Sequence, residues 1–179
     1  MTVPVLQSER LVLRGLAAGD LGAFSTFFAT DASQFVGGPK DKVGAWRTLA
    51  AMAGSWTLRG YGEFAVEEKS TGRFVGVVGP WFPEGWPERE IGWIIFPEFQ
   101  GRGYASEAAT RALEFAYAEL GWNTAISCID DRNIASQGVA RKLGAVREGE
   151  ADFKPFGMLP LYRHLPPEEF LARGKREAA

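Results

Sequence analysis

The sequence predicts a single domain of the α/β class that spans residues 1–179. Two observations lead to this class. Residues 64–67 and 73–78 are apolar stretches on either side of a polar turn that ends in Gly72, which is the pattern of an antiparallel hairpin. From residue 90 onward, strand and helix patterns follow one another in turn, without a linker or a shift in composition that would separate a second unit.

The first part of the chain is predicted to begin with a strand and two helices. Residues 8–14 alternate between polar and apolar side chains, as a half-buried strand does. Apolar residues at helical spacing then cover 21–28, and a glycine-proline break at 37–39 precedes a second helix that ends near Gly60. The predicted apolar face of this second helix comprises Val43, Trp46, Leu49, Ala50 and Ala53.

The central part carries the most apolar strand pattern, at residues 90–96, which Pro97 ends. A glycine-rich loop and an alanine-rich helix that ends at Gly121 come next. The following residues predict, in order, a strand, a helix and a strand, near 124–129, 134–143 and from 145. Residues 173–179 are polar and should form a frayed tail.

Composition excludes several classes of protein. The net charge is -2 with acids and bases interspersed, unlike the basic surface of a nucleic-acid-binding protein. No stretch approaches the roughly 18 apolar residues of a membrane span, and the N-terminus lacks a basic segment followed by an apolar one. We therefore expect a soluble, cytoplasmic protein without a nucleic-acid or membrane partner.

Cys128 is the only cysteine and His164 the only histidine, so neither residue type can form a metal-binding cluster. Cys128 lies in a predicted strand, where a buried structural thiol is expected rather than a nucleophile. His164 is expected to be a packed or exposed residue rather than a catalytic base, although its ordinary pKa lies near neutrality. No metal is predicted.

The loop after the strand at 90–96 has the features of a phosphate-binding site. It reads Gln100-Gly101-Arg102-Gly103-Tyr104-Ala105-Ser106. The two glycines let a ligand approach the main chain, and the free N–H groups at the start of the next helix favour an anion. Arg102 is a further candidate for a phosphate contact. Because the Gly-Lys-Ser/Thr ending of a P-loop and an Asp pair for magnesium are missing, a nucleotide-phosphate enzyme is disfavoured.

Four segments, at residues 8–14, 90–93, 100–108 and 133–144, together resemble the GNAT superfamily of acyl-CoA N-acyltransferases. They are most similar to its RimJ/RimL-like branch, the ribosomal-protein alanine N-acetyltransferase-like enzymes. A short glycine loop arises by chance, but four segments in the right order are specific. The resemblance implies a GNAT fold, with a mixed, mostly antiparallel sheet that is splayed at its middle, helices on both faces, and acetyl-CoA in the gap.

The resemblance also implies which residues bind the cosubstrate. The main chain of Ile94, Ile95 and Phe96 would hold the pantetheine arm of acetyl-CoA, and the glycine loop from Gly101 to Ser106 its pyrophosphate. Asn133 occupies the position whose side chain usually contacts the cofactor arm, and Ser136 lies one helical turn later on the same side.

Glu90 is the first candidate for the base that accepts the amine proton, because related enzymes often place a carboxylate there. Its alternative role is a solvated strand end, since burial against Trp81, Trp86 or Trp93 is needed to raise its pKa. These three tryptophans are candidates for the walls of an acceptor site, whereas Trp46 and Trp56 should be core residues. Glu150 and Asp152 are reserve candidates for the base.

The acid that protonates the departing thiolate is harder to assign. Many GNAT enzymes use a tyrosine seven residues after the asparagine position, and this chain has Ala140 there. Ser136 and Tyr162 are the remaining candidates, although a helical serine often bonds only its own backbone. Coenzyme A can also leave without an assigned acid.

We therefore predict an enzyme, an N-acetyltransferase that moves acetyl from acetyl-CoA directly to a primary amine in a ternary complex. The acceptor is a peptide N-terminus, an amino acid or a small amine, and the sequence does not distinguish these. The alternative is a catalytically silent acyl-CoA sensor of the same fold, which Ala140 keeps open. The oligomeric state is also open, and a homodimer is one option.

Overall fold

One sheet of eight strands organises the computed structural model, which describes residues 2–177. The strands run in the order β1-β2-β3-β4-β5-β6-β8-β7, and all neighbours are antiparallel except β5 and β6. The predicted α/β class with a mixed, mostly antiparallel sheet is confirmed. The strand bounds are β1 Leu6–Gln7, β2 Leu11–Arg14, β3 Phe64–Glu68, β4 Arg73–Trp81, β5 Glu90–Ile95, β6 Ile126–Cys128, β7 Val146–Phe153 and β8 Gly157–Arg163.

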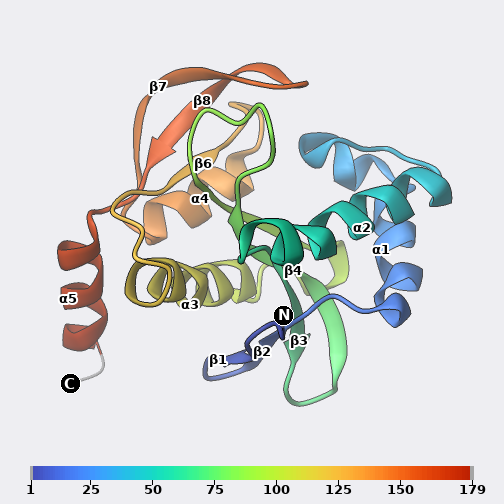
Figure 1. Cartoon of the computed structure of the whole chain (residues 1–179), viewed down its shortest axis with the longest axis horizontal. Helices are drawn as coiled ribbons and strands as arrows, with labels where there is room; N and C mark the ends of the chain where they lie inside the picture. The colour runs from blue at the N-terminus through green and yellow to red at the C-terminus, as the bar shows by residue number, and fades with distance from the viewer. Residues whose placement is uncertain (1, 178–179) are drawn as a thin grey trace.

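Five α-helices and three short 3-10 helices accompany this sheet in the described part of the chain. Figure 1 shows α1 and α2 to one side of the central strands, and α3 and α4 to the other. The helices are α1 Leu21–Phe28, α2 Lys42–Arg59, α3 Tyr104–Ala118, α4 Ile134–Lys142 and α5 Pro167–Glu177, with η1 Ala18–Asp20, η2 Asp31–Val36 and η3 Pro97–Phe99.

The C-terminal part differs from the prediction. Strand β8 and helix α5 were not expected, and α5 runs to Glu177, into the segment predicted to be a frayed tail. The helix is anchored because Phe170 is buried and its ring lies 5.8 Å from that of Tyr117 on α3. Residues 178–179 of the predicted tail lie outside the described residues.

Helix α2 buries a face that shares only Leu49 with the predicted one. Trp46 is 55% exposed and Val43 is 56% exposed, whereas Trp56 is buried as expected. Apolar side chains surround much of this helix, so the sequence pattern fits more than one inward face. The face that packs inward carries Ala45, Leu49, Met52 and Trp56.

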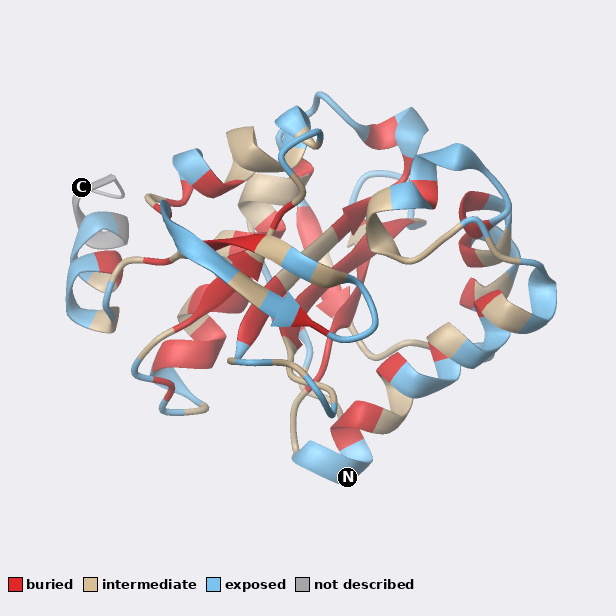
Figure 2. Cartoon of the chain, turned by 90° about the horizontal axis from the view of Figure 1, so that it is seen from above, coloured by how far each residue is buried: buried red, intermediate tan, exposed pale blue. Residues whose placement is uncertain are grey.

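The main core lies between the sheet and its helices, and Figure 2 shows buried residues along the central strands. Helix α3 packs against β4 and β5. Its buried face consists largely of alanine, and such short side chains let the helix axis approach the sheet closely. The alanines with no exposed surface are Ala108, Ala109, Ala112 and Ala116.

The sheet is splayed between β5 and β6. These two strands pair only where Glu90 lies beside Ile126. Further along β5, one edge continues to pair with β4, whereas no strand of the described chain pairs with the other edge from Gly92 to Ile94. Main-chain groups at the centre of the sheet are thereby left available, and both cavities described below open at this gap.

Candidate functional site

A cleft of about 570 Å³ lies beside β5, the glycine loop and the start of α4. Three of the segments singled out in the sequence, at 90–96, 100–108 and 133–144, meet along its walls. The predicted ligand-binding residues in the lining are Ile94, Ile95, Gln100, Gly101, Gly103, Tyr104, Ala105, Ser106, Asn133 and Ser136.

The glycine loop turns the chain so that the start of α3 faces this cleft. Gly101 and Gly103 have left-handed φ angles of 76° and 82°, which residues with a Cβ rarely adopt. Gly103 is the N-cap residue of α3, and no side chain caps the helix. Gln100 closes the loop through its Nε2, which donates to the carbonyl oxygen of Ile95 at 2.8 Å. The uncapped N–H groups and the helix dipole therefore favour an anion here.

Arg102 does not line the cleft, and its predicted phosphate contact is not supported. Its guanidinium donates to the main-chain oxygen of Glu98 at 3.0 Å and lies 3.7 Å from the Glu68 carboxylate. It also lies 5.4 Å from the ring centre of Phe99. Acceptors on the far side of the loop thus hold the arginine. The cation that lines the cleft is instead Lys142, near the end of α4.

Phe96 also lies outside the lining. Its ring packs between those of Phe27 and Phe74, at centroid distances of 5.4 and 5.1 Å. Its N–H group donates to the main-chain oxygen of Val75 at 2.9 Å. The main chain of Phe96 was predicted to hold the pantetheine arm, and its N–H group is already used within the sheet.

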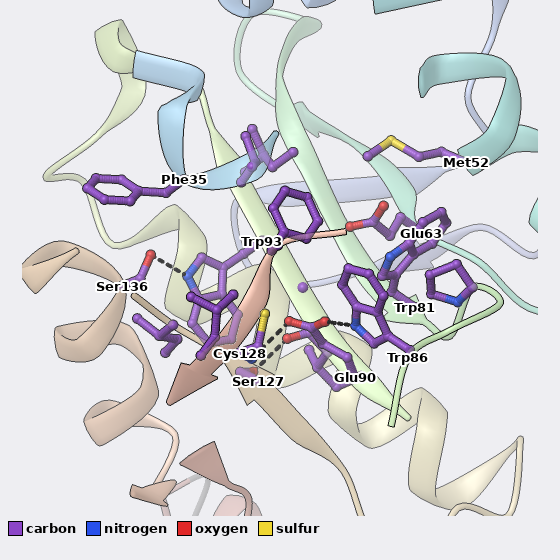
Figure 3. A pocket seen from close by; sticks show the side chains of 18 of the residues that line it. Phe35, Met52, Glu63, Trp81, Trp86, Glu90, Trp93, Ser127, Cys128 and Ser136 are labelled. Atoms are coloured by element: carbon purple, nitrogen blue, oxygen red, sulfur yellow. Dashed lines mark hydrogen bonds between the residues drawn. The ribbon is translucent and has the colours of Figure 1, made fainter. Parts of the chain in front are cut away.

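Asn133 and Ser136 stand at the N-terminus of α4. The Asn133 side-chain oxygen accepts from the Ser136 N–H group at 3.2 Å and caps the helix. Trp93 on β5 donates from Nε1 to the Ser136 Oγ at 3.2 Å, as Figure 3 shows. No described residue accepts the hydroxyl hydrogen of Ser136, so this hydrogen can be donated to a ligand.

A second cavity of about 400 Å³ adjoins the cleft. Trp81, Trp86 and Trp93, the candidate walls of an acceptor site, all line it (Figure 3). The same lining contains side chains from segments that are far apart in the sequence, such as Met52 and Phe156. The residues shared by both cavities are Phe35, Val36, Trp93, Ile94, Asn133 and Ser136.

Glu90, the predicted base, points into this second cavity and is only 6% exposed. Its carboxylate accepts hydrogen bonds from the indole N–H of Trp86 and from the main-chain N–H of Cys128, the latter at 3.0 Å. Burial raises the pKa of Glu90, and the hydrogen bonds from Trp86 and Cys128 partly oppose this. The alternative of a solvated strand end is wrong.

Glu63 is a second buried carboxyl group in the same lining, and the sequence did not reveal it. Its Oε2 has no hydrogen-bond partner among the described residues. Burial, followed by the nearby negative charge of Glu90, raises the pKa of Glu63 to about 8. A buried carboxyl without a partner and with a raised pKa is a common mark of a functional site. In the sequence it is only an acidic residue before a strand, which is too common to single out.

The reserve candidates do not reach either cavity. Glu150 and Asp152 lie on β7 and form ion pairs with neighbouring basic side chains at 3.3 and 2.8 Å. Tyr162 is buried in a small cluster that contains Ala140, and it is absent from both linings. Ser136 is thus the remaining predicted donor for a leaving thiolate.

His164 is a packed, neutral residue. Ser127 donates to the main-chain oxygen of Ile91 at 2.6 Å, so its Oγ can only accept from the His164 Nε2, at 2.9 Å. Burial, and then the charge of Arg163, lower the pKa of His164 to about 4. Cys128 lines the second cavity, but burial raises the pKa of its thiol, which argues against a thiolate nucleophile.

Within residues 2–177, no cluster of three or more His, Cys, Asp or Glu side chains could hold a metal ion. None of the helices in this range is both long and apolar enough to cross a membrane.

Comparison with known proteins identifies relatives of this chain. The sequence profile of the acetyltransferase (GNAT) domain matches residues 10–146. An acetyltransferase from Agrobacterium tumefaciens, known from its crystal structure, is 32% identical with a TM-score of 0.85, over 92% of this chain and 96% of that one. YnaD of Bacillus subtilis, described as an uncharacterized N-acetyltransferase, is 43% identical over 60 residues. That match spans 34% of this chain and 35% of YnaD.

Two more distant structures share the fold. Ribosomal-protein-S5-alanine acetyltransferase from Vibrio fischeri is 16% identical with a TM-score of 0.66, over 90% of this chain and 96% of that one. Spermidine N-acetyltransferase from Vibrio cholerae, solved with CoA and spermine, is 21% identical with a TM-score of 0.72. The match covers 92% of this chain and 99% of that one. Within one fold, these relatives are thus named for very different acceptors.

Proposed function

This chain belongs to the GNAT acetyltransferase family, and we propose that it transfers the acetyl group of acetyl-CoA directly to a primary amine bound beside it. The observation that carries the proposal is the junction of the two cavities. A cleft suited to an anion and a cavity with two buried carboxyl groups meet at Trp93, Ile94 and Ser136. Donor and acceptor bound in these cavities would meet in the gap of the sheet, where positioning alone can supply roughly 7–11 kcal/mol.

The residues of the cleft fit acetyl-CoA. The uncapped start of α3 and its two left-handed glycines suit a pyrophosphate, and Lys142 adds a positive charge. The unpaired edge of β5 at Gly92 to Ile94 offers main-chain groups to a pantetheine arm. When bound, acetyl-CoA supplies an activated thioester, so the protein needs no covalent nucleophile.

The carboxyl groups of the second cavity have the chemistry to activate an amine. An ammonium group must lose a proton before its nitrogen can attack, and we assign this proton to Glu90, directly or through water. Glu63 lies in the same lining, and the negative charge of Glu90 adds to burial in raising the pKa of Glu63 to about 8. The charge of Glu90 can attract the ammonium cation, and burial raises the pKa of Glu90, which makes it a better proton acceptor.

Ser136 is the proposed donor to the leaving thiolate. It lines both cavities, and its Oγ already accepts a hydrogen bond from Trp93, which orients the hydroxyl group. As the new C–N bond forms and the C–S bond breaks, negative charge develops on the sulfur, and a hydroxyl hydrogen at the junction can stabilise it.

Calorimetry with acetyl-CoA and coenzyme A, followed by thiol release in the presence of an amine panel, tests the proposal. We expect binding of both nucleotides and thiol release that depends on the amine. Binding without release from any amine would favour a silent acyl-CoA sensor. Absence of binding would overturn the assignment of the cleft at Gly101 to Ser106.

A further inference from the structure

Three segments that are distant in sequence cover the cavity that contains Glu63 and Glu90. They are the turn after η2, the loop between β4 and β5, and the tip of the β7–β8 hairpin, and Figure 1 shows the last two rising to the same edge of the molecule. The Phe156 ring at the hairpin tip lies 5.8 Å from the Trp86 ring. The Phe156 ring also packs against Gly37, the turn residue after η2. A Cβ added to this glycine would lie only 3.2 Å from the Phe156 Cζ. Phe156 therefore bridges the other two segments.

This cover limits the size of what the cavity can hold. Its volume of about 400 Å³ lies toward the low end of the roughly 300–1,000 Å³ typical of small-molecule pockets. Trp86 also contacts Phe153, at 5.5 Å between ring centres, so the cover is tied to the hairpin at two points. A folded protein that presents its N-terminus would have to displace these contacts, whereas a small amine would not.

The polar groups of the cavity suit one positive charge. Glu90 has hydrogen-bond partners only in Trp86 and Cys128, and Glu63 Oε2 has none among the described residues. The remaining acidic residue of the lining, Glu84, is fully exposed and pairs with an arginine at 3.4 Å. Among the described residues of the lining, Glu63 and Glu90 are thus the acidic groups without a basic partner, and a cation bound between them would favour their ionised forms (Figure 3).

The basic groups of the lining argue against acceptors with further charges. Lys40 Nζ donates to Thr48 Oγ1 at 2.8 Å, and Lys154 pairs with Asp152 at 2.8 Å. Both lysines would repel the second cation of a polyamine. Lys154 is already paired with Asp152, and the carboxylate of an amino acid would share the cavity with the negative charge of Glu90.

Most of the remaining wall is aromatic or apolar, and its uncharged polar residues are Thr48, Ser127, Asn133 and Ser136. Trp81, Trp86, Trp93 and Phe35 line the cavity, together with Met52. Indole faces attract an ammonium group, and flat apolar bodies stack on them. A peptide main chain would place its polar N–H and C=O groups against these rings, which costs free energy when their hydrogen bonds are lost.

We infer that the acceptor is a small, singly charged primary amine with a flat apolar body, an arylalkylamine, bound with its ammonium group between Glu63 and Glu90. This inference rests on the proposed acetyl transfer and selects one of the three acceptor classes that the sequence left open.

A matched panel tests it: 2-phenylethylamine, phenylalanine, a short peptide that begins with phenylalanine, and spermidine. Thiol release with acetyl-CoA gives kcat/KM for each, and quenching of tryptophan fluorescence gives amine binding without acetyl-CoA. We expect 2-phenylethylamine to exceed the other three at least about tenfold in kcat/KM, which corresponds to about 1.4 kcal/mol. Equal or faster turnover of any of the other three overturns the inference and leaves the transferase intact.

Failure of the proposed function is distinguishable from failure of this inference. If acetyl-CoA does not bind, the function fails, and fluorescence still shows whether the cavity prefers 2-phenylethylamine. If acetyl-CoA binds but 2-phenylethylamine neither binds nor reacts, the inference is overturned.

The cover provides a second test through Phe156→Ala. Loss of the Phe156 ring should open the cover. The ratio of kcat/KM for 2-phenylethylamine to kcat/KM for the peptide should then fall by at least about threefold, which corresponds to about 0.7 kcal/mol. Trp46→Ala is the matched control, because Trp46 is 55% exposed, Phe156 is 45% exposed, and Trp46 lines neither cavity. If the folded Phe156→Ala protein keeps the same ratio of kcat/KM values, the cover does not select the acceptor by size.

Discussion

The cleft and the cavity beside it are built in different ways. The anion-binding end of the cleft comes from one continuous stretch, residues 100–106, and its chemistry resides in main-chain N–H groups and glycine conformations. The cavity takes its chemistry from side chains such as Glu63, Glu90 and Phe156, which three separate parts of the sheet bring together. The first kind of site depends on local geometry, and the second depends on how the whole domain packs.

This difference predicts that the two sites can be damaged separately. A change in the cleft should alter the affinity for acetyl-CoA, whereas a change in the cavity should alter turnover and acceptor choice. The sites share Trp93, Ser136 and their neighbours, so the separation should fail only at that junction.

The largest expected effect is on the cavity side, in Glu90→Gln. Loss of the proposed base should lower kcat by about 100-fold or more, within the range typical of general base catalysis. Steady-state thiol release measures kcat, and calorimetry should give an unchanged Kd for coenzyme A.

Glu119→Gln is the matched control for this variant. Glu119 lies at the C-terminal end of α3, is 53% exposed, and lines neither cavity. A Glu90→Gln protein that keeps its kcat would show that another group accepts the proton. A loss of coenzyme A affinity in the same variant would show that the two sites are not separable.

The second effect is on the cleft side, in Gly103→Ala. The φ angle of 82° costs a residue with a Cβ roughly 1–2 kcal/mol, and the first turn of α3 can relieve this strain only by moving. We expect the Kd of coenzyme A, measured by calorimetry, to rise about tenfold, which corresponds to 1.4 kcal/mol.

Gly54→Ala in α2 is the control for Gly103→Ala, because the backbone there is helical and a Cβ would meet no atom within 4 Å. That variant should keep its affinity for coenzyme A. If both variants bind equally well, the left-handed turn is not needed for the anion site.

The same contrast explains how much the sequence could predict. Spacing and glycine pattern were enough for the order of elements from β3 to β7 and for the loop at 100–106. The family prediction is confirmed as well, by the domain match over residues 10–146. These features depend on local periodicity, turn chemistry and capping, which a single sequence records directly.

The sequence could not predict what depends on packing between distant segments. The raised pKa of Glu63 arises only because burial removes its hydrating water and Glu90 lies near it. Trp46 was expected in the core, but the inward face of α2 is decided by contacts that the helix pattern does not contain. The cover over the cavity likewise depends on β8, whose pattern was not recognised.

A third effect, on stability and not on binding or turnover, is the pH dependence that Glu63 introduces. Its pKa of about 8 in the folded protein lies well above the roughly 4.3 of an unfolded chain. Between these values the folded state retains a proton that the unfolded state has lost, so stability falls as pH rises. About one unit or more below the unfolded-state pKa, the group is protonated in both states and has no effect.

Glu63→Gln removes this penalty, because glutamine does not titrate. Its stability relative to the parent protein should therefore improve from pH 5 to pH 8.5, by at least about 1.4 kcal/mol, or roughly 3–6 °C in Tm. Thermal unfolding at a series of pH values measures this difference. The pKa of His164 is lowered to about 4, so its titration makes stability rise with pH. This contribution is present in both proteins and cancels in the difference between them. A pH-independent difference would mean that Glu63 is not buried as a titrating acid.

The smallest effects compare two cations near the anion site. Arg102 belongs to the loop by sequence, yet its guanidinium is held by Glu98 and Glu68 on the far side, whereas Lys142 comes from α4 and lines the cleft. Arg102→Ala should change the Kd of coenzyme A less than about twofold. Lys142→Ala should raise it up to about fivefold, because an exposed ion pair contributes up to about 1 kcal/mol.

Calorimetry at low and moderate salt distinguishes these two cations, since only the contribution of Lys142 should weaken as salt is added. The reverse result, a larger loss in Arg102→Ala, would mean that the arginine swings into the cleft when a phosphate is present. Proximity in the sequence would then have been the better guide to the anion site than the packing of the free protein.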